Sequence, residues 1–363
     1  MRLFFDARYI KTDFHDGMSR YSAKLGSALA AITPTTFIIC DERQLDALPP
    51  ESASVRLHSP VSLLEPFSAL FINKHHPDVV ISPQQTIGSL GRRYRLILTQ
   101  QDMTYYRLPT PPADLPWYVR VLWRLYHRAY WPGRLLLNRA EVVATVSQAS
   151  KREIENASLT KRSIIVVPNA AEDLSTYLDK PITQGDTPPK NLVFMGAFYP
   201  HKNVETLVVM MRYLPSRTLH LLSKVSAKRR VELLRLAHTA SQIVFHDGVS
   251  DKDYVRILAD DAIMVSASKS EGFGLPLAEA LKLGVPAVVS DIAVFHEVAG
   301  DGALYAPATD AQAFAHAVTQ LDAQSARTTL ATKGQSHIAS FDWNRSAMTI
   351  YQAATQLIGE TVK

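Results

Sequence analysis

The chain contains one stretch that combines a tight turn with a helix start: Ser270-Glu271-Gly272-Phe273-Gly274-Leu275-Pro276-Leu277-Ala278-Glu279-Ala280. Gly272 and Gly274 permit backbone angles that are closed to other residues, and Pro276 fits the first helical position because its missing N–H needs no partner there. The stretch therefore predicts a loop that contains Glu271, followed by a helix that begins at Pro276 and carries Glu279 in its early turns.

A helix that begins in this way is a ready site for phosphate, because its first N–H groups lack partners and its dipole favours an anion. A carboxylate next to a phosphate repels it, unless the ligand also offers hydroxyl groups that the carboxylate can bind. These residues alone leave two interpretations open. One is a site for a phosphorylated sugar, and the other is an ordinary strand-to-helix turn whose glutamate is stabilised by the helix dipole.

Outward from this stretch, short apolar runs alternate with longer amphipathic runs, which is typical of strand-helix units with a parallel sheet. The predicted strands are residues 3–5, 36–39, 79–82, 96–99, 142–146 and 164–167 in the first half, and 192–195, 219–222, 243–245, 262–265, 287–289 and 303–305 in the second. Because ligands bind outside the carboxyl ends of such strands, the loop after residues 262–265 lies at the expected edge.

The 363 residues exceed what one hydrophobic core usually serves. Residues 173–190 contain three prolines and a glycine, which is typical of a linker. We therefore predict an α/β protein of two doubly wound, Rossmann-like domains that face a cleft. Their expected bounds are 1–172 and 191–342, with a linker at 173–190 and a C-terminal helix at 343–363.

The composition of the chain limits the expected cellular compartment and the expected classes of binding partner. The lone Cys40 excludes an internal disulfide and suits a reducing cytoplasm, and no apolar run approaches the roughly 20 residues that span a bilayer. We expect the first residues to form a buried strand, not a secretory signal. The net charge of +5 favours nucleoside diphosphates or an anionic lipid surface as partners. Zinc-ligand cysteines, an RNA-binding aromatic motif and a long basic run are lacking, which argues against nucleic acid.

The glycine-rich stretch, followed by Gly284-Val285-Pro286, closely resembles the signature of family 4 retaining glycosyltransferases of GT-B fold. The resemblance covers residues 243–308 almost continuously and includes residues 142–153 and 166–169. It implies the two-domain GT-B fold, in which a terminal helix crosses back to the first domain. The sequence leaves open whether residues 343–358 do this or cap their own domain.

The resemblance also implies an activity: a hexose moves from a nucleoside diphosphate sugar to a hydroxyl of a lipid-linked or glycan acceptor. No residue is a convincing nucleophile, which suits the family's front-face mechanism, in which the leaving phosphate helps to deprotonate the acceptor. Residues 272–300 and the strand before Asp102 look most like bacterial mannosyltransferases of surface polysaccharides, which favours GDP-mannose. The alternatives are a nucleotide-sugar epimerase of the same fold and a non-catalytic nucleotide-sugar-binding partner.

Roles in donor binding follow from the resemblance, position by position. Glu279 would hold the donor ribose. Glu271 would hold the sugar hydroxyls and the phosphate, together with the backbone of Phe273, Gly274 and Leu275.

Three further positions complete the expected donor site. Lys202 would neutralise charge on the leaving diphosphate, which is the largest electrostatic demand of glycosyl transfer. Gly17 would let the diphosphate approach the backbone, because it lacks a Cβ. The main chain near Val249 would hold the base. No metal and no cofactor is expected, since no Asp-x-Asp pair ends a predicted strand and neither His-x-x-x-His nor a cysteine cluster occurs.

The chain departs from the family pattern at several positions. Ala197 stands where many members carry arginine, and His201 stands where arginine often precedes the lysine, so phosphate binding would rest on Lys202. Gln101 replaces a histidine before Asp102. Asp102 either orients an acceptor hydroxyl or caps the following turn, and both interpretations stay open. The candidate catalytic residues are therefore Lys202, Glu271 and Asp102.

Residues 117–134 interleave aromatic residues with arginines, and Arg120, Arg124 and Arg128 recur every fourth residue on one face of a predicted helix. One interpretation is peripheral contact with an anionic membrane, on the inner face if the protein is cytoplasmic. The other is a helix whose aromatic residues pack on the sheet while its arginines face water.

Overall fold

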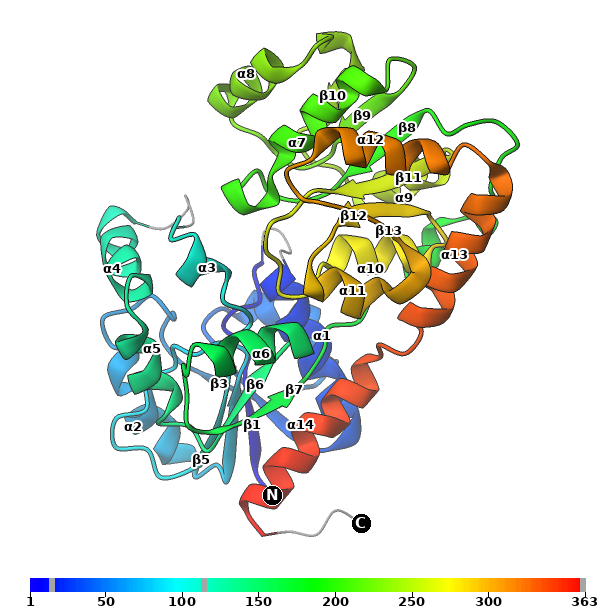
Figure 1. Cartoon of the computed structure of the whole chain (residues 1–363). Helices are drawn as coiled ribbons and strands as arrows, with labels where there is room; N and C mark the ends of the chain where they lie inside the picture. The colour runs from blue at the N-terminus through cyan, green and yellow to red at the C-terminus, as the bar shows by residue number, and fades with distance from the viewer. Residues whose placement is uncertain (13–16, 112–115, 360–363) are drawn as a thin grey trace. The chain divides into compact units, whose positions relative to one another are not determined.

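The computed structural model describes residues 1–12, 17–111 and 116–359 and divides the chain into two compact units (Figure 1). Unit 1 consists of Met1–Asn169 and Asp342–Lys363, and unit 2 of Ala170–Phe341. Each unit has its own parallel sheet, so the predicted α/β class with two Rossmann-like units is confirmed. No helix of the described residues is both long and apolar enough to cross a membrane.

Unit 1 is built on a seven-stranded sheet with the order β3-β2-β1-β4-β5-β6-β7. Its strands are β1 (Leu3–Asp6), β2 (Thr35–Ile39), β3 (Ser54–Arg56), β4 (Val79–Ser82), β5 (Arg95–Thr99), β6 (Val142–Thr145) and β7 (Ser163–Val166). β1, β4 and β6 are buried along their whole length, because a parallel sheet is covered on both faces. The sequence predicted these strands to within one residue at each end, except β3, which it missed.

The helices of unit 1 are α1 (Gly17–Ile32), α2 (Ser68–Ile72), α3 (Thr104–Arg107), α4 (Trp117–His127), α5 (Tyr130–Leu137), α6 (Gln148–Asn156) and α14 (Trp343–Leu357). α14 follows unit 2 in the chain but packs on α1, with the ring centroids of Tyr21 and Trp343 6.0 Å apart. The hydroxyl of Ser346 donates to the carbonyl of Pro168 at 2.7 Å. The terminal helix therefore returns to the first unit, as the family resemblance implied.

Unit 2 is built on a six-stranded parallel sheet with the order β10-β9-β8-β11-β12-β13. Its strands are β8 (Asn191–Phe194), β9 (Thr218–Leu221), β10 (Ile243–Phe245), β11 (Ala262–Ser266), β12 (Ala287–Ser290) and β13 (Leu304–Ala306). All six were predicted to within one residue at each end, because each is a short apolar run between helical patterns.

The helices of unit 2 are α7 (Val204–Met210), α8 (Ala227–Leu236), α9 (Asp251–Ala259), α10 (Leu275–Lys282), α11 (Ala293–Ala299), α12 (Ala311–Gln320) and α13 (Gln324–Ile338). α7 and α12 cover one face of the sheet, and α10 and α11 lie on the other (Figure 1). Short 3-10 helices occur as η1 (Glu42–Ala47), η2 (Glu65–Phe67), η3 (Asn73–His75), η4 (Leu174–Tyr177), η5 (Pro200–Lys202), η6 (Met211–Tyr213), η7 (Ala240–Gln242) and η8 (Gly300–Gly302).

The segment 173–190, expected to be a linker, is part of unit 2. The buried guanidinium of Arg327 donates to the carbonyls of Gly185 and Thr187, and the Gln184 amide donates to the carbonyl of Gly284 at 3.0 Å. The Arg327 bonds satisfy carbonyl groups of the segment that lie outside regular secondary structure. The chain passes between the units at residues 169–170 and 341–342 instead.

Candidate active site

The loop between β11 and α10 contains the turn at Glu271. Gly274 caps α10 with a φ of 94°, in the left-handed region, and a Cβ there would lie 2.7 Å from Cε1 of Phe295. Both the backbone and the packing therefore require glycine. The helix begins at Leu275, one residue earlier than predicted. Pro276 occupies its second position, where a missing N–H is equally harmless.

The start of α10 offers unpaired hydrogen-bond donors. Within the described part of the chain, the backbone N–H groups of Phe273, Gly274 and Leu275 donate to no protein acceptor. Those of Leu277 and Ala278 donate to the carbonyl of Gly274 at 3.0 and 3.1 Å. Three free donors at the positive end of a helix favour an anion. The turn thus offers the groups that a phosphate would use, and its occupation by a phosphate stays a prediction.

Lys202 and Glu271, assigned separately from the sequence, contact one another. The Lys202 ammonium lies 2.6 Å from Oε1 of Glu271, and the hydroxyl of Ser268 donates to the same oxygen at 2.7 Å. Lys202 ends η5 in the loop after β8, whereas Glu271 follows β11, and these two strands are neighbours in the sheet. The pair is only partly exposed, with 19% of the lysine side chain and 12% of the glutamate side chain accessible.

His201 precedes the lysine and is buried. Burial and, to a lesser degree, the nearby Lys202 charge lower the pKa of His201 from 6.5 to about 4, although Glu271 opposes the shift. The imidazole is therefore neutral at pH 7 and lies stacked against Tyr199, with ring centroids 5.7 Å apart. It supplies none of the positive charge that an arginine would bring.

Asn203, which the sequence analysis did not identify, fixes the lysine loop. It adopts a φ of 50°, in the left-handed region that asparagine tolerates better than most residues. Its side-chain amide donates to the carbonyls of Ala267 and Ala308 at 3.0 and 2.6 Å. An asparagine before an apolar helical run predicts a helix cap. The sequence could not reveal that its partners come from the loops after β11 and β13.

Glu279 lies in the second turn of α10 and is 3% exposed. The first turn of this helix carries no acidic residue. The interpretation of Glu279 as a first-turn glutamate stabilised by the helix dipole therefore does not fit. Charged side chains are rarely buried to this degree, so Glu279 does not serve solubility alone. The assignment of Glu279 to a ribose stays a prediction.

Val249 lies in a tight turn between β10 and α9. Asp247 and Gly248 both adopt positive φ values, of 55° and 102°, and the Gly248 N–H donates to the carbonyl of Leu222 at 2.8 Å. Ser250 then caps α9 by accepting the Asp253 N–H at 3.1 Å. The turn brings the main chain of Val249 to the carboxyl edge of the sheet, where a base could contact it.

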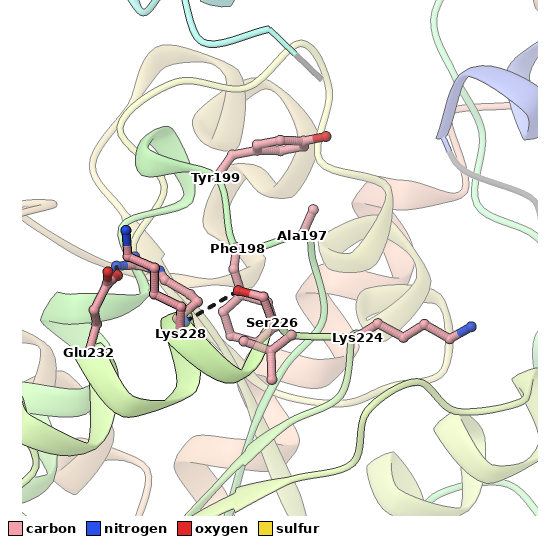
Figure 2. Close-up of a pocket in the computed structure, with 9 residues that line it drawn as sticks. Ala197, Phe198, Tyr199, Lys224, Ser226, Lys228 and Glu232 are labelled. Carbon is pink, nitrogen blue, oxygen red and sulfur yellow. Dashed lines mark hydrogen bonds and ion pairs between the residues drawn. The ribbon is translucent and has the colours of Figure 1, made fainter. Parts of the chain in front are cut away.

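A cavity of about 410 Å³ lies beside Ala197, the position where arginine is common in the family that the sequence resembles (Figure 2). Its walls come from residues 197–199 after β8, from residues 224–226 after β9 and from the first turns of α8. Lys224, Lys228 and Arg229 contribute positive charge to it. None of these residues was predicted to belong to the site, although basic residues that follow the end of a strand are a signal that could have identified them.

The candidate residues of unit 1 lie at the carboxyl ends of its strands. Gly17 is the first residue of α1 and is exposed, while the preceding residues 13–16 lie outside the described part of the chain. Asp102 accepts the Thr104 N–H at 2.8 Å, which is the turn-capping role that the sequence left open. Gln101 donates to the carbonyl of Pro83 at 3.2 Å in place of a histidine. The assignment of Gly17 to a diphosphate stays a prediction.

The segment 117–134 forms two helices, α4 and α5, instead of the single helix expected. Pro132 explains the break, because its ring would clash with the carbonyl of Arg128 in a continuous helix. The interpretation in which the aromatic residues pack on the sheet while the arginines face water does not hold for every aromatic residue. Trp123 packs against Tyr105, with centroids 4.8 Å apart, but Trp117 and Trp131 are 77% and 67% exposed.

Among the residues that the structure describes, no three histidine, cysteine, aspartate or glutamate side chains gather in a way that could hold a metal ion.

Comparisons with known proteins agree with this architecture. Residues 176–336 match the model of the family described as "Glycosyl transferases group 1". The chain is 27% identical over 275 residues to an O-antigen chain mannosyltransferase B of Escherichia coli, covering 71% of this chain and 70% of that protein. It is 26% identical to the serotype-specific mannosyltransferase WbdA of E. coli, but spans only 28% of its length. It also matches 53% of the O-antigen chain mannosyltransferase RfbU of Salmonella typhimurium at 26% identity.

Solved structures support the fold. A sucrose-phosphate synthase from Thermosynechococcus elongatus superposes with a TM-score of 0.75 at 18% identity, covering 99% of both chains. WaaG, a glycosyltransferase involved in lipopolysaccharide biosynthesis, superposes with a TM-score of 0.67 at 13% identity, covering 98% of this chain and all of WaaG. The expected GT-B fold and the resemblance to mannosyltransferases are therefore confirmed.

Proposed function

We propose that this chain, a glycosyltransferase of GT-B fold, moves a hexose from a nucleoside diphosphate sugar to a hydroxyl of a lipid-linked or glycan acceptor, with retention of configuration. The observation that carries the proposal is the contact between Lys202 and Glu271 beside the unpaired N–H groups of residues 273–275. The lysine and the N–H groups suit a diphosphate, and the carboxylate suits the hydroxyls of a sugar.

Donor binding would change the partner of Lys202. The ammonium would turn from Glu271 to the diphosphate, and the freed carboxylate oxygen would accept a hydrogen bond from a sugar hydroxyl. Because negative charge on the diphosphate grows as the glycosidic bond breaks, Lys202 would stabilise the transition state more than the ground state. The neutral His201 adds no charge, so this task rests on Lys202 and on the helix start. The chemistry needs neither a metal nor a cofactor.

The nucleoside would lie along the same edge of unit 2. The main chain of Val249 would hold the base and Glu279 the ribose hydroxyls, in the roles implied by the family resemblance. The leaving phosphate would help to deprotonate the acceptor hydroxyl, so catalysis would consist mostly of positioning and charge stabilisation.

GDP-mannose is the donor that we favour, because the relatives with matching sequences are named as mannosyltransferases, two of them as O-antigen chain mannosyltransferases. Transfer assays with GDP-mannose, UDP-glucose and ADP-glucose and a mannose-containing glycan acceptor test this choice. We expect transfer with GDP-mannose. Transfer only from UDP-glucose or ADP-glucose would contradict GDP-mannose as the donor. No transfer from any of the three would favour a non-catalytic nucleotide-sugar-binding role. Nothing in the comparisons supports the epimerase alternative.

The exposed surface of α4 and α5 supports peripheral contact with a membrane. Trp117, Val121 and Leu125 follow one another at four-residue spacing, as do Tyr118 and Leu122, and all five are exposed. The exposed Trp131 and Leu135 of α5 extend the set. We call these seven side chains the α4–α5 apolar surface.

Exposed arginines accompany the α4–α5 apolar surface at positions 124, 128 and 134. A helix with an exposed apolar face and flanking arginines suits the headgroup zone of an anionic bilayer, where the apolar side chains reach the acyl boundary and the guanidinium groups meet phosphates. We propose that unit 1 docks on such a membrane through this surface. A lipid-linked acceptor would then be presented at the bilayer.

A further inference from the structure

The loop after β9 is held between the loops after β8 and β10. β9 lies between these two strands in the sheet. The Gly196 N–H donates to the hydroxyl of Ser223 at 3.2 Å, and the Gly248 N–H donates to the carbonyl of Leu222 at 2.8 Å. Residues 222–224 therefore have a fixed place at the carboxyl edge of unit 2, beside the turn that precedes Val249.

Lys224 lies over that turn. A Cβ built on Gly248 would meet Cγ of Lys224 at 3.2 Å and Cε at 3.3 Å, so the aliphatic part of the lysine runs along the glycine. Gly248 also needs its positive φ of 102°, so any other residue there would be strained and would displace the lysine. The lysine stem is thus held while its end stays exposed.

The ammonium of Lys224 is not neutralised within the described part of the chain, where it makes no ion pair or hydrogen bond. Two basic residues near Lys224, in contrast, are engaged in ion pairs. Arg229 pairs with Glu205 and Glu232, and Arg230 pairs with Asp247. In Figure 2 the Lys224 side chain extends away from Ser226 and Glu232. A cation that is held at its stem and unpaired at its tip is available to a ligand at this edge.

The position of Lys224 assigns it to the base end of the donor, if the proposed function holds. Lys202 follows β8 and pairs with Glu271 after β11, whereas Lys224 contacts the turn after β10, on the other side of β9. Neighbouring strands lie about 4.8 Å apart, so the two lysines serve parts of the ligand separated by several ångströms. Lys202 would meet the diphosphate, and the turn before Val249 would meet the base.

We propose that Lys224 selects the nucleotide base by donating a hydrogen bond to its acceptor edge. An ammonium can only donate, and guanine presents two adjacent acceptors, O6 and N7, on one edge. Adenine places an amino donor where guanine has O6, and that group opposes the ammonium. Lys224 therefore favours guanine over adenine in the donor nucleotide.

Binding of GDP, IDP and ADP to the full chain, measured by calorimetry, tests the proposal. Inosine shares O6 and N7 with guanine. Lys224→Met keeps an aliphatic stem over Gly248 but removes the donor, and Lys228→Met is the matched control from the same cavity. We expect Lys224→Met to weaken GDP and IDP binding roughly tenfold and to leave ADP binding unchanged. The control should bind all three nucleotides as the unaltered chain does.

Two results would overturn the base assignment while leaving the proposed function intact. An equal loss for GDP, IDP and ADP would mean that Lys224 contacts the phosphates, and no loss for any of them would mean that its ammonium stays in solvent. A third result, in which the unaltered chain binds no nucleoside diphosphate, would overturn the proposed function as well.

Discussion

The Lys202 ammonium and the Glu271 carboxylate form an ion pair across two neighbouring loops of unit 2, with 2.6 Å between Nζ and Oε1. Ser268 holds the carboxylate from one side at 2.7 Å, and Asn203 anchors the backbone just after the lysine. Each member of the pair is thus positioned before any ligand binds. In the pair, each charge neutralises the other at a site where a donor would use both. The diphosphate would need the ammonium, and the sugar would need the carboxylate.

Replacement of Lys202 by alanine should lower turnover more than donor affinity, because the charge it meets grows in the transition state. Loss of such a charged interaction costs about 2–4 kcal/mol, or roughly 30- to 1,000-fold in kcat. Steady-state kinetics and donor titration measure the two effects separately. Lys269→Ala, an exposed lysine nearby, is the control and should change neither. A loss confined to donor affinity would contradict the role.

Replacement of Glu279 by alanine should weaken binding of the nucleoside diphosphate sugar by about 1–3 kcal/mol, the scale of a lost charged hydrogen bond. A double-mutant cycle with 2′,3′-dideoxy-GDP separates the ribose contact from general destabilisation. In the unaltered chain, removal of the ribose hydroxyls should cost affinity, whereas Glu279→Ala should bind both nucleotides alike. Additive losses would argue against a ribose contact.

The free energy of unfolding should decrease as the pH is lowered, because of His201. Burial and the charge of Lys202 lower the pKa of this histidine to about 4. Below its ordinary pKa of 6.5 the unfolded chain binds a proton at this residue, whereas the folded protein does not until about pH 4. The free energy of unfolding therefore decreases as the pH falls from 6.5 to 4, by up to about 3 kcal/mol.

Urea unfolding of the unaltered chain and of His201→Gln at pH 7, 5.5 and 4.5 isolates this contribution. The difference between the two proteins should shift in favour of the variant as the pH falls. A difference that stays constant across this range would mean that His201 titrates normally in the folded protein.

Membrane docking should depend on the α4–α5 apolar surface. Trp117→Ala combined with Leu122→Ala removes two of its most exposed side chains, each worth about 1.5–3 kcal/mol if fully buried in lipid. Flotation with vesicles of phosphatidylglycerol and phosphatidylcholine should show at least about tenfold weaker binding. Tyr213→Ala, an exposed aromatic residue of unit 2, is the control. Equal flotation of all three proteins, or no flotation of the unaltered chain, would contradict the proposal.

The sequence predicted most of the fold, because the buried strands are apolar runs that stand out locally. It missed β3, whose residues Ser54–Arg56 are exposed or half-buried at a sheet edge. It placed the start of α10 one residue late because Gly274, not Leu275, takes the left-handed cap conformation. It placed a linker at residues 173–190 because it could not foresee that Arg327, far along the chain, holds their carbonyls.

The sequence predicted Lys202 and Glu271 as separate site residues, but it did not predict the contact between them. Lys202 and Glu271 are 69 positions apart, and only the strand order brings β8 next to β11. The same reason hid Asn203 and Lys224, whose contacts come from other loops. Local patterns predict where a turn or helix begins, whereas hydrogen bonds between loops depend on which strands become neighbours.

The anomeric configuration of the product tests the central claim most directly. The chain would be incubated with GDP-α-mannose and a mannose-containing glycan acceptor, and the new linkage would be identified by NMR. Retaining transfer through the Lys202 and Glu271 site predicts an α-linked mannose, formed by Lys269→Ala as well and lost in Lys202→Ala. A β-linked product, or an α-linked product formed equally well without Lys202, would contradict the account.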